Sequence, residues 1–333
     1  MKGGAVFRQR FVRSLAALVA AGALAAGCGD DGGGGGGGGG GGEASGPQTL
    51  KIGLIPIADV APVFLGIKKG FFSEQQLELD PQFAAGGAAI TPAVVSGDFD
   101  IGFSNTVSLL IAGSKDLPVQ IISQGVLGGP DKSKPWADLL VPEDGPVKEP
   151  KDLEGKTIAA NTLNNICEVT INATLEKKGV DVSKLKYTEI PFPEMVAALE
   201  GGRVDAACVV EPFVTQGKGA GMRGIAPFYA ETAPNLTVAA YFASRQYIEE
   251  NGEVVDRFVT AMEKSLQYAS ENPDEVRDVL TEYTEIPPEA AKTINLPSWR
   301  PELTEDTIQQ LSELSQKYGL IEEQPDLNEL IRR

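Results

Sequence analysis

The residues of this sequence that could bind a small molecule are carboxylates, amides, hydroxyls and glycines that stand just after short apolar runs. Three asparagines fall within residues 161–165, more than one helix cap requires, so we expect ligand contact there. For the polar residues at 104–106, helix capping and ligand contact are equally supported. The expected ligand-binding residues are Ala58, Asp59, Gly86, Gly87, Ser104, Asn105, Thr106, Asn161, Thr162, Asn164, Asn165 and Glu211.

Asp59 and Glu211 bear on the charge of the ligand. An unpaired carboxylate beside an anion is strongly unfavourable, so if both side chains enter the pocket, the ligand should bring N–H donors or a positive charge. In the alternative, which we prefer, Asp59 caps the first helix and Glu211 hydrogen-bonds to backbone near a hinge. A sulfonate or nitrate ligand stays open in that case.

Histidine is absent from all 333 residues, and this removes several classes of chemistry. Ser-His-Asp and Cys-His nucleophiles are excluded, as are metal sites built on histidine. Cys167 and Cys208 are too few for a zinc site, and no paired-carboxylate motif stands out. We therefore expect a binding protein rather than an enzyme, with no cofactor and no metal ion.

Residues 1–27 have the layout of a secretion signal. Basic residues up to Arg13 precede an apolar run at 15–26, which is too short to span a bilayer about 30 Å thick. Cys28 follows small residues in a sequence that resembles a bacterial lipobox, so we expect it to be lipidated. A glycine run at 32–42 makes residues 28–48 a flexible tether. The body is then expected on the extracytoplasmic face of the membrane.

The charge of the chain argues against one class of partner. Removing the four basic residues of the leader from a total of 29 leaves 25 against 46 acidic residues, a net charge of −21. Nucleic acid is therefore not expected as a partner, because neutralising phosphates needs a basic face.

Cys167 and Cys208 would lie in an oxidising compartment, where disulfides persist. One falls early in an expected helix and the other on a strand that could neighbour it. Of the two possible states, we prefer two buried free thiols to a disulfide.

Strand and helix patterns alternate along the chain and predict an α/β fold. A glycine- and proline-rich segment at 128–150, expected to be a loop, separates two such series, and a helical tail follows residue 243. The expected strands are 50–55, 77–83, 101–103, 119–124, 156–160, 186–190, 204–210 and 236–243.

Four phrases of the sequence resemble those of periplasmic binding proteins. Residues 66–72 (GIKKGFF) resemble A-x-x-K-G-x-F, and residues 95–102 (VSGDFDIG) resemble L-x-S-G-x-x-D-I-G. Residues 151–159 (KDLEGKTIA) resemble x-D-L-x-G-K-T-I-A, which opens the second lobe in that family, and residues 197–207 (AALEGGRVDAA) resemble A-A-L-x-x-G-x-V-D-A. The most similar branch serves ABC importers of nitrate, sulfonates, taurine and thiamine precursors.

This resemblance implies a two-lobed type II periplasmic-binding-protein fold, with two open, mostly parallel sheets and a helical C-terminal part. It places lobe I at 49–141 plus 236–333 and lobe II at 142–235, with a small-molecule ligand between them. The implied partners are an ABC permease and its ATPase, for a monomeric protein. The alternatives are a fold-related enzyme of pyrimidine and thiamine-precursor metabolism, which depends on a histidine absent here, and a ligand sensor for a membrane receptor.

Overall fold

The structure, a computed structural model, describes residues 46–129 and 131–333. The expected signal peptide, Cys28 and the tether up to residue 45 lie outside the described residues. No helix within the described residues has both the length and the apolar composition needed to cross a bilayer.

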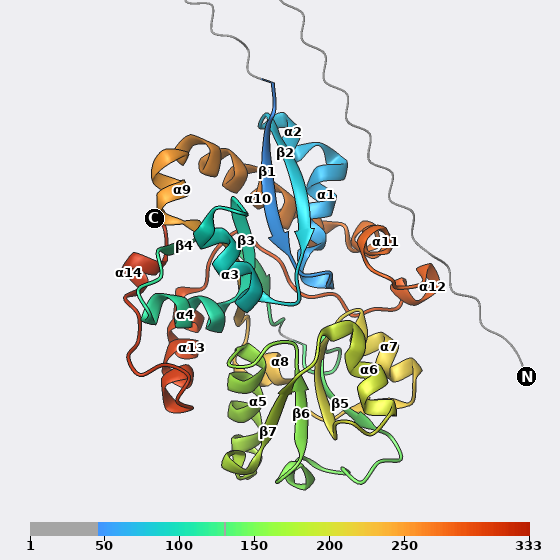
Figure 1. Cartoon of the computed structure of the whole chain (residues 1–333). Coiled ribbons are helices and arrows are strands. Elements are labelled where there is room, and N and C mark those ends of the chain that lie inside the picture. The colour runs from blue at the N-terminus through green and yellow to red at the C-terminus, as the bar shows by residue number, and fades with distance from the viewer. Residues whose placement is uncertain (1–45, 130) are drawn as a thin grey trace, which may run out of the picture. The chain divides into compact units, whose positions relative to one another are not determined.

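One five-stranded sheet is built from the first series of strands and from one strand near the start of the helical tail (Figure 1). Its order is β2-β1-β3-β10-β4, and we call the part built on it lobe I. The three neighbours β2, β1 and β3 are parallel, whereas β10 is antiparallel to both β3 and β4. The strands are β1 (Gln48–Leu54), β2 (Leu77–Phe83), β3 (Ile101–Asn105), β4 (Val119–Leu127) and β10 (Thr237–Ser244).

A second five-stranded sheet, in the order β7-β6-β8-β5-β9, forms what we call lobe II. Here β7, β6 and β8 are parallel, and β5 is antiparallel to β8 and β9. Each sheet thus has one strand opposed to the other four, which confirms the expected open, mostly parallel α/β architecture. The strands are β5 (Ala137–Pro142), β6 (Thr157–Ala160), β7 (Lys186–Glu189), β8 (Ala206–Val210) and β9 (Met222–Gly224).

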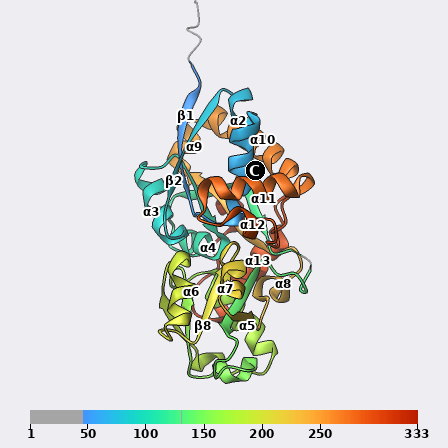
Figure 2. The same cartoon turned by 90° about the vertical axis from the view of Figure 1, so that its right-hand side faces the viewer.

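Helices cover both sheets, and the C-terminal part is mainly helical, as Figure 2 shows from the side. In lobe I these are η1 (Ala58–Val60), α1 (Ala61–Lys69), α2 (Phe71–Glu74), α3 (Gly87–Ser96) and α4 (Thr106–Ser114). In lobe II they are η2 (Pro150–Leu153), α5 (Ile166–Lys177), η3 (Val182–Lys184), α6 (Phe192–Glu200), α7 (Phe213–Gly219) and α8 (Phe228–Thr232). The C-terminal helices are α9 (Arg245–Glu250), α10 (Gly252–Glu271), α11 (Pro273–Tyr283), α12 (Pro288–Ala291), α13 (Glu305–Lys317) and α14 (Leu327–Leu330).

The core lies between the sheets and these helices. All residues of β3, β8 and β10 are buried, as expected for strands covered on both faces. α10 buries Val255, Phe258, Met262 and Leu266, which recur at helical spacing and face α1 and α2. The periodicity of the sequence therefore predicts the buried face of this helix correctly.

The expectation of a loop at 128–150 is wrong, because this segment contains β5. Leu139, Leu140 and Val141 are fully buried, and β5 pairs with β8 in lobe II. The predicted boundary between residues 141 and 142 therefore falls inside a strand of the second sheet. Pro135 and Pro142 bracket this short apolar run and give the segment the composition of a loop. The connections between the sheets are instead residues 128–136 and 225–236.

Candidate functional site

Loops at the carboxyl ends of the parallel strands of both lobes meet each other. The Asn161 side chain, after β6, donates from Nδ2 to the carbonyl oxygen of Ala85, after β2, at 3.1 Å. The backbone N–H of Ala58, after β1, donates to the carbonyl oxygen of Glu211, after β8, at 2.9 Å. Ligands of open α/β sheets bind at such strand ends, so these loops define the candidate site.

A pocket of about 260 Å³ lies between these loops. Both lobes contribute to its wall, which contains no charged side chain and no side-chain hydrogen-bonding group. Its lining residues are Ile55, Pro56, Ile57, Phe83, Ala84, Ala85, Pro191, Phe192, Pro193 and Phe213.

Aromatic rings dominate the chemistry of this pocket. Phe83 is 48% exposed, and its ring lies 6.2 Å from that of Phe64, which stacks on Tyr283 at 4.0 Å. From lobe II, the rings of Phe192 and Phe213 lie 6.0 Å apart and nearly parallel, with 9° between their planes. A planar ring entering from solvent can therefore contact aromatic faces of both lobes.

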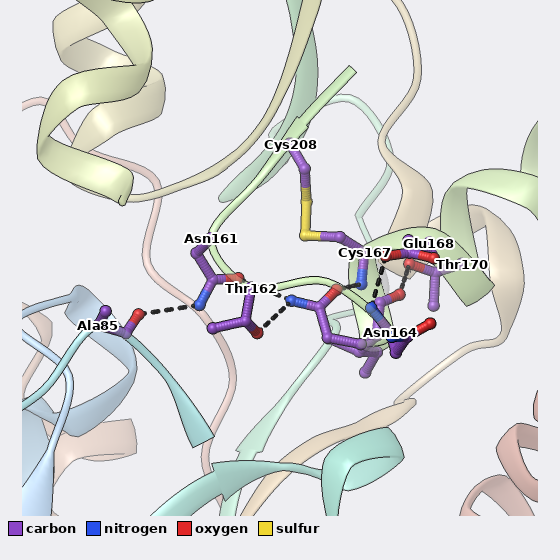
Figure 3. Close-up of a disulfide and its surroundings, with 10 residues drawn as sticks. Ala85, Asn161, Thr162, Asn164, Cys167, Glu168, Thr170 and Cys208 are labelled. Carbon is purple, nitrogen blue, oxygen red and sulfur yellow. Dashed lines mark hydrogen bonds between the residues drawn. A yellow bond between two sulfur atoms is a disulfide. The ribbon is translucent and has the colours of Figure 1, made fainter. Parts of the chain in front are cut away.

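The expected ligand loop at 161–165 is organised by hydrogen bonds within the protein (Figure 3). Asn165, which is fully buried, donates from Nδ2 to Asn161 Oδ1 at 2.9 Å and to Thr162 Oγ1 at 3.0 Å. Its Oδ1 accepts from the backbone N–H of Cys167 at 2.9 Å and so caps α5. Asn164 has a positive φ of 52° and lies at the surface. The loop faces lobe I, while contact of these residues with a ligand stays a prediction.

The polar residues after β3 are also bonded within the protein. Asn105 accepts from the backbone N–H of Ser108 at 2.9 Å and caps α4. The Thr106 hydroxyl donates to the Thr237 carbonyl oxygen at 2.6 Å, and the Ser104 hydroxyl donates to the Asn105 carbonyl oxygen at 3.3 Å. Helix capping is therefore realised by Asn105, and no finding tests ligand contact at these positions.

Gly86 lies where the two lobes approach each other closely, and Gly87 lies where α3 approaches β3 within lobe I. A Cβ on Gly86 would stand 2.7 Å from Asn161 Nδ2, and a Cβ on Gly87 would stand 1.9 Å from Ser104 Oγ. Larger residues at these positions would therefore displace their neighbours.

Asp59 is buried in η1 and does not line the pocket. The expected capping role is wrong, because neither η1 nor α1 has a side-chain cap. Among the described residues, Oδ1 of Asp59 has no hydrogen-bond partner. Burial raises the pKa of this carboxyl to about 8, although a hydrogen bond to its own backbone lowers it in part. Asp59 therefore holds its proton at neutral pH.

Glu211 is buried beside the connection between the lobes, where its carboxylate is fully bonded. Oε2 accepts from the backbone N–H of Thr215 at 3.0 Å. Oε1 accepts from the Thr215 hydroxyl at 2.8 Å and from the backbone N–H of Asn295 at 3.4 Å. Burial raises the pKa of Glu211 to about 7 against these hydrogen bonds. The expected hydrogen bonding of Glu211 to backbone is confirmed, whereas a hinge at this place stays a prediction.

Cys167 and Cys208 form a disulfide, so the preferred interpretation of two free thiols is wrong. α5 is the next element after β6, joined to it by the 161–165 loop, and β6 pairs with β8, so Cys167 in the first turn of α5 comes close to Cys208 on β8. This arrangement brings the two Cα atoms to 6.1 Å, within the range that a disulfide spans. The bond ties the end of the 161–165 loop to the centre of the lobe II sheet.

The aromatic lining of the pocket is what the sequence analysis missed. Phe213 directly follows Glu211 and Pro212, and Phe192 stands between two prolines after β7. Both positions follow strands at the edge where ligands bind, and that placement was the available signal. Within the described residues, no group of three or more Cys, Asp or Glu is arranged to hold a metal ion.

The fold and the interlobe pocket define a two-lobed α/β protein with a pocket between its lobes, and comparison with known proteins supplies its family. Residues 57–276 match the family model described as NMT1/THI5 like. The chain therefore belongs to the NMT1/THI5-like family, which confirms the resemblance drawn from the sequence phrases.

Relatives of this chain include proteins named for different ligands. It is 26% identical over 223 residues to the formylaminopyrimidine-binding protein of Halalkalibacterium halodurans, a match that covers 66% of this chain and 64% of the relative. It is 25% identical over 214 residues to the taurine-binding periplasmic protein of Escherichia coli, covering 61% of each. The chain thus spans less than two thirds of the length of both relatives.

A solved structure with the same fold is the alkanesulfonate-binding protein SsuA from Xanthomonas axonopodis pv. citri bound to MOPS. The TM-score is 0.71 at 17% identity, and the match covers 87% of this chain and 100% of that one. At this level of identity the likeness concerns the fold alone.

Proposed function

We propose that this protein captures a small organic solute between its two lobes and delivers it to an ABC importer. The observation that carries the proposal is the aromatic pocket formed jointly by the loops after β1 and β2 and by residues 191–193 and 213. A pocket shared by two lobes changes shape when they move apart, which couples ligand capture to hinge motion. Relatives that are named as binding proteins for small molecules support the same function.

The pocket supports binding rather than catalysis. Its ten lining residues carry no acid, base or nucleophile. The two buried carboxyls nearby, Asp59 and Glu211, lie outside this lining. We therefore propose that the protein is not an enzyme.

The proposed ligand is an uncharged molecule with a planar ring. Phe83, Phe192 and Phe213 offer aromatic faces, whereas the lining offers no side-chain donor for a sulfonate or nitrate. The inference of a cationic ligand required both carboxyls to enter the pocket, and neither is part of its wall. Among the named ligands of relatives, a pyrimidine fits this lining and taurine does not.

The remaining parts of the proposal concern location and partners. We propose that the leader directs secretion, that Cys28 carries a lipid, and that the body works as a monomer at the extracytoplasmic face of the membrane. The glycine run at 32–42 supports a tethered body, and a relative named as a periplasmic binding protein supports a permease and an ATPase as partners.

A screen of solutes by thermal unfolding of the full chain carrying Cys28→Ala tests this function. The panel contains neutral pyrimidines and larger planar heterocycles, with taurine, an alkanesulfonate and nitrate as anionic members. A ligand at 100 times its dissociation constant stabilises the protein by about 2.7 kcal/mol, which raises the midpoint of unfolding by several degrees. A neutral ring compound should give this rise. If no member of the panel does so, the proposed function is contradicted.

A further inference from the structure

We infer that Asn161 is a latch that holds the two lobes closed, and that Asn165 and the Cys167–Cys208 disulfide position it. The inference rests on the proposed function, because a latch matters only for a protein that closes on a ligand. It assigns Asn161 and Gly86 a role in closure rather than in ligand contact.

The latch consists of one hydrogen bond between closely packed residues of the two lobes. Asn161 Nδ2 of lobe II donates to the Ala85 carbonyl oxygen of lobe I at 3.1 Å. The next residue, Gly86, leaves the space that the Asn161 amide occupies, because a Cβ there would stand 2.7 Å from Nδ2 and 2.9 Å from Thr162 Cγ2. Gly86 has a φ of 174°, which any residue adopts, so a side chain at this position meets an obstacle only across the cleft.

Backbone groups at the two ends of a series of hydrogen bonds determine which way the side-chain amide of Asn161 points (Figure 3). The Cys167 N–H can only donate, so Asn165 must turn Oδ1 towards it and Nδ2 towards Asn161. Asn161 must then present Oδ1 to Asn165, which leaves Nδ2 facing the carbonyl oxygen of Ala85. A carbonyl oxygen can only accept, so each donor in this series of hydrogen bonds faces an acceptor.

The disulfide holds the start of this series of hydrogen bonds in place. Cys167 is bonded to Cys208 on β8, a strand buried throughout. The N–H that orients Asn165 is therefore fixed to the lobe II sheet rather than to a free helix end. The latch is thus a rigid projection of lobe II that closes on the backbone of lobe I.

The backbone hydrogen bond from Ala58 to the Glu211 carbonyl oxygen also joins the lobes beside the pocket, but no side-chain substitution removes it. The other hydrogen bonds between the lobes that involve a side chain lie elsewhere. Glu211 and Asn295 meet beside the interlobe connection. The Tyr318 hydroxyl, just after α13, donates to Glu176 of α5 at 2.9 Å on an exposed face. The contact between Asn161 and Ala85, by contrast, joins the loops that follow β6 and β2, next to the pocket wall.

Three substitutions in the full chain carrying Cys28→Ala separate the latch from general stability. Asn161→Ala removes the hydrogen bond, and Gly86→Ala inserts a methyl group that only the closed form meets. Asn165→Asp keeps an oxygen for the Cys167 N–H but loses the donors, so the Asn161 amide turns to the new carboxylate and away from Ala85. Gly252→Ala is the matched glycine control, since a Cβ there meets nothing within 4 Å.

The primary measurement is the distance between spin labels on exposed positions of the two lobes, Lys115→Cys and Glu200→Cys. The native disulfide does not react with the labels. Asn161→Ala, Gly86→Ala and Asn165→Asp should shift the distance distribution to larger values, whereas Gly252→Ala should match the parent protein. Equal distributions for the parent and the three latch variants would overturn the inference.

Release of a ligand found in the solute screen gives the second measurement. The loss of one hydrogen bond should speed release about three- to tenfold, with the unfolding midpoint of Asn161→Ala close to that of the parent. Unchanged release rates would also overturn the latch, although the proposed function would stand. If the parent binds no solute, the proposed function fails, and the label distances still decide on the latch.

Discussion

Asp59 allows a quantitative test of the structure, because its carboxyl group is buried and Oδ1 lacks a partner among the described residues. Burial raises the pKa of Asp59 from its ordinary 3.8 to about 8 in the folded protein. Between these values, the folded protein holds a proton that the unfolded chain has released. The free energy of unfolding contributed by this group is therefore highest at low pH and falls as the pH rises to about 8.

The perturbation is Asp59→Asn, which keeps the size of the side chain and removes its titration. The gap between the two pKa values corresponds to about 6 kcal/mol as an upper value, at about 1.4 kcal/mol per pH unit. Near pH 4, where the carboxyl is protonated in the folded protein and still partly protonated in the unfolded chain, the variant and the wild type should differ by less than about 1 kcal/mol. By pH 8 the variant should be more stable by several kcal/mol.

Urea unfolding at pH 4, 6 and 8, followed by tryptophan fluorescence, measures this difference. Trp136 and Trp299 are both buried, and the indole N–H of Trp299 donates to the Asp59 carbonyl oxygen at 3.1 Å. Subtracting the free energy of unfolding of the wild type from that of the variant cancels the contributions of other titrating groups, including Glu211. A stability difference that stays constant from pH 4 to pH 8 would refute the reasoning, since it would mean that Asp59 does not take up a proton on folding.

Three further predictions concern the pocket, the disulfide and the anchor. Phe192→Ala should weaken binding of a ring ligand about 10- to 100-fold in calorimetry, because an aromatic face of the pocket is lost, and unchanged affinity would argue against the proposed pocket. Replacing Cys167 and Cys208 together by alanine should lower the free energy of unfolding by about 4 kcal/mol, given the loop that the bond closes. Denaturant titration measures this, and a variant as stable as the wild type would contradict it. Cys28→Ala should release the protein from membranes and abolish labelling by a fatty-acid probe, whereas an unlabelled wild type would exclude the lipid anchor.

Much of the fold is predictable from the sequence because its strands are short apolar runs bounded by turn residues. β3 and β8 are buried on both faces and stand out for this reason, and β1 shows alternating burial followed by a buried run. β5 is the exception, since its apolar residues are few and two prolines flank them. Its assignment to lobe II depends on antiparallel pairing with β8, which local composition does not encode.

The site is predictable only in part. The asparagine-rich loop at 161–165 follows β6 and faces the other lobe, as its place at a strand end indicates. That the Asn165 side chain is fully hydrogen-bonded depends on how the loop folds within lobe II. That Asn161 reaches Ala85 depends on how the lobes meet. The aromatic wall escaped prediction for the same reason, because Phe83 and Phe192 are ordinary apolar residues until two lobes bring them together.

A crystal structure with a ring ligand from the solute screen tests the central claim most directly. The ligand should lie between the lobes, with its ring against Phe83 on one side and Phe192 or Phe213 on the other. A larger groove of about 490 Å³, formed by lobe II and the connections between the sheets, offers a different location. It is lined by Lys132, Lys218 and other residues of 132–138 and 218–227. Electron density for the ligand in that groove, with the interlobe pocket unchanged, would contradict the account.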